Sequence, residues 1–221
     1  MERHFDDELN ALKHKLLKMA DTAQEMIGLA IKALVDRKEL LTQEVVALEG
    51  KVNHMEVEIE EDVMRLMALR QPAARDLRLL TAILKINNDL ERVADQAVNI
   101  SEIAADLLKQ APLKPLIDIP KMAALAQKMI KNSLDAFVRH DPILAKDVCE
   151  DDDEVDKIND QIFRELLTYM IEDPKNITRA VDLILVSRNI ERIADHATNI
   201  SEDVVFIEEG KNIKHHIQDS P

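Results

Sequence analysis

One stretch of this sequence occurs twice: Leu90-Glu91-Arg92-Val93-Ala94-Asp95-Gln96-Ala97-Val98-Asn99-Ile100-Ser101-Glu102 returns as Ile190-Glu191-Arg192-Ile193-Ala194-Asp195-His196-Ala197-Thr198-Asn199-Ile200-Ser201-Glu202. Between the two copies the apolar positions change among Leu, Ile and Val, whereas most of the polar positions stay the same. Packing alone requires only that the apolar positions match. The matched polar residues therefore indicate a second requirement, which we interpret as functional.

The period of the repeated stretch predicts a helix with one apolar face. At roughly 100° per residue, Glu91, Asp95 and Glu102 lie far from the centre of that face. Their counterparts Glu191 and Asp195 are placed in the same way, so we expect an outward stripe of carboxylates on each helix. A solvated acidic face is the ordinary explanation of such a stripe, whereas its matched recurrence favours a functional one.

The composition predicts a helical globular protein that does not bind nucleic acid. Apolar residues make up 46% of 221 residues, which is enough for a core without metal or disulfide support. Only three glycines occur, so glycine-rich phosphate-binding loops are excluded. The net charge of −14 repels nucleic acid, and a chain with one Tyr and no Trp lacks aromatic platforms for stacking bases.

The sequence also predicts a cytoplasmic location. Cys149 is the only cysteine and cannot form an internal disulfide, which fits a reducing compartment. The acidic start of the chain does not resemble a secretory signal. No apolar run approaches the roughly 18 residues that a membrane-spanning helix needs, so we expect membrane association only through partners.

Helical periodicity and proline positions predict an all-α fold of two tandem, similar three-helix bundles. The expected helices cover residues 5–36, 38–70, 73–110, 120–140, 142–172 and 174–209. The first bundle is expected over 1–111, a proline-containing linker over 112–119, and the second bundle, with a short polar tail, over 120–221. We expect each bundle to have its own independent apolar core, because the two halves repeat.

Several residues predict the helix ends. Asp141 and Asp173 each precede a proline, as an N-cap residue does. Pro72 is expected at the start of the third helix, and Gly210 at the end of the sixth.

The recurring carboxylates predict a metal site in each half. Glu91 with Asp95, and Glu191 with Asp195, are four residues apart and lie one above the other on a helix. The preceding helix supplies further candidates in each half, and these are Asp152 and Asp156 and their counterparts Glu49 and Asn53. Oxygen ligands favour Mg²⁺, Mn²⁺ or iron, and Zn²⁺ only outside a closed thiolate site. Asn53 predicts a less anionic first site.

A carboxylate-bridged metalloenzyme on a helical bundle is the alternative. A ferritin-like di-iron enzyme needs Glu-x-x-His on two helices, pointing inward. No histidine here follows a glutamate by three residues, and no nucleophile with a neighbouring base stands out. We therefore expect a protein that is not an enzyme.

These residues resemble the PhoU family, regulators of bacterial phosphate uptake, and the resemblance covers essentially the whole chain. It rests on two E/D-x-x-x-D motifs, Glu91 to Asp95 and Glu191 to Asp195, with Asp152-x-x-x-Asp156 as a further copy. The segments Arg70-Gln71-Pro72 with Asp76-Leu77-Arg78, and Tyr169-Met170-Ile171-Glu172-Asp173, resemble further family signatures. Glu49-x-x-x-Asn53 departs from the carboxylate pattern.

The resemblance implies properties that spacing alone does not. It implies two similar three-helix bundles, metal ions held on the carboxylate motifs, and frequent homodimers. It also implies a regulator without catalytic activity, which connects the ATPase of the phosphate ABC transporter with a phosphate-responsive sensor histidine kinase. Such a regulator represses the phosphate-starvation response when phosphate is plentiful.

Overall fold

The computed structural model describes residues 2–211 and 213, and over these residues it is all-α, as the sequence predicts. No β-strand occurs within these described residues. Six α-helices and a short 3-10 turn follow one another as α1 (Glu2–Asp36), α2 (Leu40–Arg70), α3 (Ala74–Leu108), α4 (Asp118–Arg139), α5 (Pro142–Glu172), η1 (Pro174–Asn176) and α6 (Ile177–Glu209). The connection between α3 and α4 therefore covers residues 109–117, and Pro120 lies in the first turn of α4, where a missing backbone N–H costs little.

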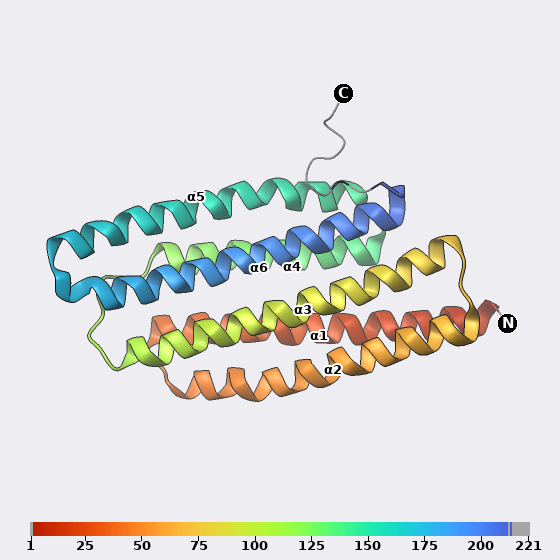
Figure 1. Cartoon of the computed structure of the whole chain (residues 1–221), viewed down its shortest axis with the longest axis horizontal. Helices are drawn as coiled ribbons and strands as arrows, with labels where there is room; N and C mark the ends of the chain where they lie inside the picture. The colour runs from red at the N-terminus through yellow and green to blue at the C-terminus, as the bar shows by residue number, and fades with distance from the viewer. Residues whose placement is uncertain (1, 212, 214–221) are drawn as a thin grey trace, which may run out of the picture.

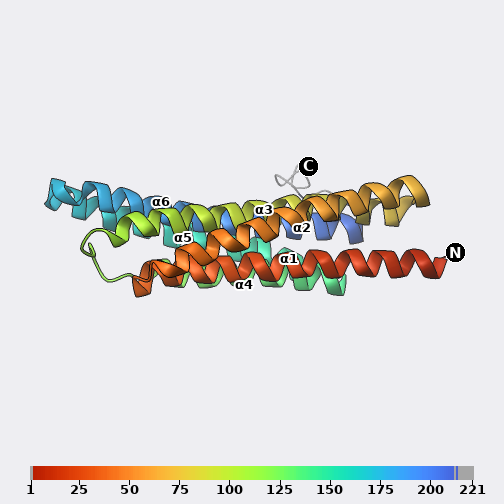
Figure 2. The ribbon, with the colours of Figure 1, turned by 90° about the horizontal axis from the view of Figure 1, so that it is seen from below.

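The two three-helix units lie side by side along their length (Figure 1). Helices α3 and α6 run antiparallel through the middle, α1 and α4 lie on one side of them, and α2 and α5 form the two outer edges (Figure 2). Polar pairs along the contact between α3 and α6 are Lys85–Asp203, Asp89–Asn199 and Asn99–Asn189. These pairs are centred on Ala94 and Ala194, equivalent residues of the two copies, so the halves are related by an approximate twofold axis there.

The apolar side chains of both halves form one continuous core, so the expectation of two independent cores is wrong. The buried residues of α3 are not confined to one face, because they occupy more than half of the circumference of the helix. They include Ala94 as well as Asp89 and Gln96. Ala94 and Ala194 are almost fully buried, and their small side chains permit α3 and α6 to approach closely. The second buried side of α3 faces α6 instead of solvent, and this contact joins the two cores.

Most of the predicted helix ends are confirmed by their capping contacts. The Asp141 carboxylate accepts hydrogen bonds from the backbone N–H groups of Ile143 and Leu144, at 3.0 and 3.1 Å. Asp173 caps the 3-10 turn that leads into α6, and Gly210 ends α6 with a φ of +69°. Pro72 is the exception.

The prediction that Pro72 starts the third helix is wrong by two residues. Helix α2 ends at Arg70, and Gln71 takes a left-handed conformation with a φ of +47°. Helix α3 then begins at Ala74, and Ala73, which offers no side-chain oxygen, precedes it. Pro72 therefore belongs to the turn, where its fixed φ limits the path of the chain between the two helices.

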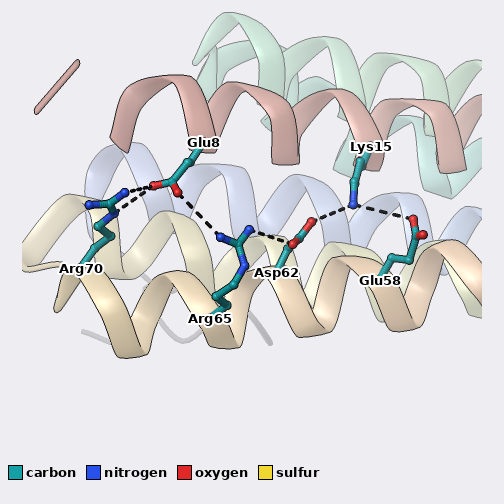
Figure 3. A network of polar contacts seen from close by, with 6 residues as sticks. All are labelled: Glu8, Lys15, Glu58, Asp62, Arg65 and Arg70. Carbon is teal, nitrogen blue, oxygen red and sulfur yellow. Dashed lines mark hydrogen bonds and ion pairs between the residues drawn. The ribbon is translucent and has the colours of Figure 1, made fainter. Parts of the chain in front are cut away.

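A network of charged side chains fixes α2 against α1 (Figure 3). Glu8 on α1 accepts an ion pair from Arg70 at 2.8 Å and a weaker one from Arg65 at 3.7 Å. Asp62 accepts hydrogen bonds from Arg65 at 2.9 Å and from Lys15 of α1 at 2.8 Å. Single surface pairs contribute about 0–1 kcal/mol each, but a connected network holds the register of the two helices more firmly. This register determines which α2 residues face α3.

Candidate functional site

The four carboxylates predicted in the second half lie along the contact between α5 and α6. Asp152 and Asp156 come from α5, and Glu191 and Asp195 come from α6, which runs antiparallel beside it (Figure 1). Their negative charges act across the contact: Asp195 and Asp156 raise the pKa of Asp152, and both also raise the pKa of Glu191. The structure therefore brings together the second set of predicted site residues, which are separated by about forty residues in sequence.

Among the described residues, no close ion pair balances the negative charge of this cluster, although the charges of Arg188 and Arg192 lower the pKa of Glu191. Burial, followed by the charges of Asp195 and Asp156, raises the pKa of Asp152 to about 6. Burial and the neighbouring carboxylates also raise the pKa of Glu191 and of Asp195. Within the described part of the chain, none of the four carboxylates forms an ion pair with a basic side chain. A bound cation would remove this repulsion.

The donor set fits a hard cation, although the side chains are not gathered around one point. Over residues 2–211 and 213, no three His, Cys, Asp or Glu side chains are placed to hold one metal ion. The carboxylates would have to rotate toward a shared ion. Asp152 also lines an open groove of about 740 Å³ with Cys149, Thr198 and Glu202. Burial raises the pKa of the Cys149 thiol to about 11, so the groove offers oxygen ligands and no thiolate at neutral pH.

The site predicted in the first half is partly neutralised by its own arginine. Arg92 lies 3.4 Å from the Glu91 carboxylate and 3.1 Å from that of Asp95. Burial, followed by the charge of Asp95, raises the pKa of Glu91. Arg192, at the equivalent position, forms no ion pair within the described residues. Arg192 still lowers the pKa of Glu191 and of Asp195, so the two halves differ in how closely an arginine holds the carboxylates.

Helix α2 contributes Glu56 to the first site, a residue that the sequence analysis missed. The charge of Glu56 raises the pKa of Glu91, which shows that α2 presents this carboxylate toward α3. Glu49 is half-buried, and Asn53 is exposed. Glu56 lies seven residues after Glu49, so its helical spacing could have identified it. Its counterpart on α5 is Asn159, so each half combines two acidic residues and one asparagine at three matched positions.

The predicted outward stripe of carboxylates is only partly correct. Glu102 is exposed, but the Glu91 side chain is 22% exposed and that of Asp95 is 32% exposed. Both lie on the flank of α3 that faces α2, beside Glu56. The helical wheel of a single helix does not show which neighbour covers its flank, and here that neighbour is α2.

His196 and Gln96 occupy the contact between α3 and α6 and not the carboxylate sites. Nδ1 of His196 lies 2.8 Å from the Asp89 carboxylate, and Asn199 donates to the same oxygen at 3.3 Å. Gln96 is 8% exposed. The difference between the two copies at this position therefore concerns how the halves pack, and the His196 ring also lowers the pKa of Glu91 and of Asp195.

None of the helices in the described part of the chain contains an apolar stretch long enough to cross a membrane.

Comparison with known proteins gives one family for both halves of the chain. The PhoU domain matches residues 16–104 and again residues 119–204. A phosphate-specific transport system accessory protein PhoU homolog from Aquifex aeolicus is 43% identical over 213 residues, which cover 96% of each chain. A homolog of the same name from Pseudomonas aeruginosa is 37% identical over 216 residues, covering 97% of this chain and 89% of that one.

Solved structures agree with the sequence matches. The crystal structure of PhoU from Pseudomonas aeruginosa superposes with a TM-score of 0.91 at 38% identity, covering 94% of this chain and all of the other. The phosphate transport system regulatory protein PhoU from Streptococcus pneumoniae gives a TM-score of 0.87 at 25% identity, covering 95% of this chain and 99% of the other. The duplicated six-helix architecture is therefore shared.

Proposed function

Because this chain belongs to the PhoU family, we propose that it is a cytoplasmic regulator of phosphate uptake that represses the phosphate-starvation response. In this proposal it couples the ATPase of the phosphate ABC transporter to a phosphate-responsive sensor histidine kinase. A role in phosphate transport follows from its relatives, which are named phosphate-specific transport system accessory proteins. The chain acts by binding partners, as a homodimer, and does not turn over a substrate.

The observation that carries the metal part of the proposal is the unbalanced carboxylate cluster between α5 and α6. Asp152, Asp156, Glu191 and Asp195 would hold Mg²⁺, Mn²⁺, iron or Zn²⁺, and Glu91, Asp95, Glu49 and Asn53 would form the equivalent site, with Glu56 added. A bound cation neutralises the carboxylates and links the two helices that carry them. In this role the metal supports a surface that partners recognise.

Deletion of the encoding gene tests the regulatory role directly. A phosphate-starvation reporter in the deletion strain should stay active in high phosphate, and the wild-type chain should restore repression. Normal repression in the deletion strain would refute the regulatory proposal, whatever metals the protein binds.

The metal part is tested separately with an Asp152→Asn/Asp156→Asn variant. Elemental analysis of the purified variant should show less metal than wild type, whereas an Asp151→Asn/Asp153→Asn variant on the same helix serves as the control. Equal metal content in all three proteins would refute the site. Metal-dependent turnover of a phosphate ester that Asp195→Ala abolishes would favour the metalloenzyme alternative.

A further inference from the structure

Helix α6 carries a row of apolar side chains that the core does not use. Ile177, Val181 and Leu185 are spaced by four residues, so they lie on one face of the helix. They are 45%, 41% and 42% exposed. The core contacts of the same segment come from other residues, such as Ala180 and Leu183, which are buried. The exposed row is therefore available to a partner.

Helix α5 exposes a second apolar row at the same end of the α5–α6 hairpin. Phe163, Leu167 and Ile171 are also spaced by four residues, and all three are exposed. Helices α5 and α6 run side by side and are joined by the short turn η1 (Figure 1). The end of this helical hairpin thus exposes six large apolar side chains. Single exposed apolar residues are common on protein surfaces, whereas a group of this size indicates an interaction site.

Two arginines continue the α6 row toward the middle of the helix. Arg188 follows Leu185 by three residues and Arg192 follows it by seven, so both lie on the same face as Val181. Both arginines are exposed. Within the described residues neither forms an ion pair as close as that of Arg92 with Glu91 in the first half, although the charges of both lower the pKa of Glu191. On a chain with a net charge of −14, two exposed arginines without a close ion pair offer donors that an acidic group of a partner can contact.

The first half does not repeat this surface. The positions that match the α6 row lie on α3 and are Leu77, Thr81, Lys85, Asn88 and Arg92. Lys85 is paired with Asp203 at 3.0 Å and lies over the ring of Phe206, so its charge is already engaged within the chain. The positions that match the α5 row are Glu60, Met64 and Ala68. The duplicated fold therefore does not require the surface, which is specific to the second half.

We propose that this surface binds an amphipathic helix of another protein. We call it the hairpin face and define it by Phe163, Leu167, Val181, Leu185, Arg188 and Arg192. Apolar residues at helical spacing on two adjacent helices form the kind of surface that accepts a third helix through its own apolar stripe. The bound helix carries its apolar residues at the η1 end and two acidic residues about two turns further along, opposite Arg188 and Arg192.

Fluorescence anisotropy with two synthetic helical peptides tests the hairpin face. One peptide carries leucines at positions i, i+4 and i+8, with glutamates at i+11 and i+15, and the other carries lysines in place of those glutamates. A metal chelator is present throughout, so that peptide carboxylates cannot bind through a metal at Glu191 or Asp195. Wild type should bind the glutamate peptide at least about tenfold more tightly than the lysine peptide.

Variants locate the binding and provide controls. Val181→Ser/Leu185→Ser should weaken binding by at least about fivefold, whereas Leu77→Ser, at the first-half position that matches Ile177 and is equally exposed, should leave it unchanged. Arg188→Glu/Arg192→Glu should reverse the preference between the two peptides, a readout that a loss of folding would not produce.

Three results would overturn the proposal. Equal binding of both peptides to wild type would exclude the charge contact. A loss with Leu77→Ser as large as that with Val181→Ser/Leu185→Ser would place the binding elsewhere. Self-association of wild type in sedimentation, abolished by Leu185→Glu, would make a second copy of the chain the occupant in place of another protein.

Discussion

The Asp89 carboxylate on α3 accepts a hydrogen bond from Nδ1 of His196 on α6, 2.8 Å away, across the boundary between the two halves. At the position related by the approximate twofold axis, Asn189 accepts a weaker bond from Asn99 at 3.4 Å. The boundary thus contains one ionisable pair and one neutral pair. The acceptors Asp89 and Asn189 are both buried between α3 and α6, where these bonds favour one register of the two helices.

Replacement of Asp89 by alanine should destabilise the protein by about 1–3 kcal/mol, because His196 and Asn199 lose their common acceptor in a largely buried place. Urea unfolding measures this change. Asp106→Ala is the control, since Asp106 and its partner Lys109 are both 70% exposed, and it should change stability by less than about 0.5 kcal/mol. Similar effects of the two substitutions would contradict a structural role for the Asp89 contact.

The continuous core predicts that the two halves unfold together. Separation of residues 1–111 from 112–221 would expose the sides of α3 and α6 that are now buried against each other. Calorimetry of the whole chain should therefore show a single transition, and residues 1–111 expressed alone should melt at a lower temperature. Two separate transitions, with the first half unchanged in isolation, would restore the picture of independent bundles.

The raised pKa of Asp152 predicts how stability depends on pH in the metal-free protein. The folded value of about 6 exceeds the unfolded value near 4, so the folded state binds more protons between these pH values. The contribution of Asp152 to stability should fall as pH rises from about 4 to about 6 and stay level above that. At pH 7, Asp152→Asn should therefore be more stable than wild type, by about 1 kcal/mol after solvent screening.

Thermal melts of metal-free wild type and Asp152→Asn, recorded from pH 4 to pH 8, check this dependence. The difference between the two proteins isolates Asp152 from carboxylates that are paired elsewhere, such as Asp62. A difference that is constant across the whole range, or that grows as pH falls, would contradict the assignment.

Removal of Arg92 should strengthen cation binding in the first half. Arg92 holds both Glu91 and Asp95, so a metal ion has to compete with it for these oxygens. Arg92→Ala should lower the dissociation constant for Mn²⁺ at this site about tenfold, equivalent to about 1.4 kcal/mol. Arg192→Ala, at a position without such an ion pair, should have a smaller effect. Calorimetric titration of both variants with Mn²⁺ measures these dissociation constants. A larger effect of Arg192→Ala would contradict the conclusion that the arginine of the first half competes more strongly with the metal ion.

The sequence by itself determined the features that depend on nearby residues. The spacing of apolar residues predicted six helices, since a helix shows its buried face within a few turns. Asp141 and Gly210 marked helix ends correctly, because capping contacts reach only two to four residues along the chain. The repeated polar motif identified the carboxylates on α6 and, by helical spacing, those on α5.

Only the tertiary structure decided which neighbouring helix covers each side of α3 and α6, because this depends on how the helices pack against one another. It joined the two cores through α3 and α6, because both helices bury more than one face. It brought Glu56 to Glu91, and it paired Arg92 closely with its neighbours while leaving Arg192 without a close ion pair among the described residues. The physical reason is that a helical period fixes angles around one axis only. Burial, pKa shifts and the pairing of charges arise between helices, at distances that no local pattern encodes.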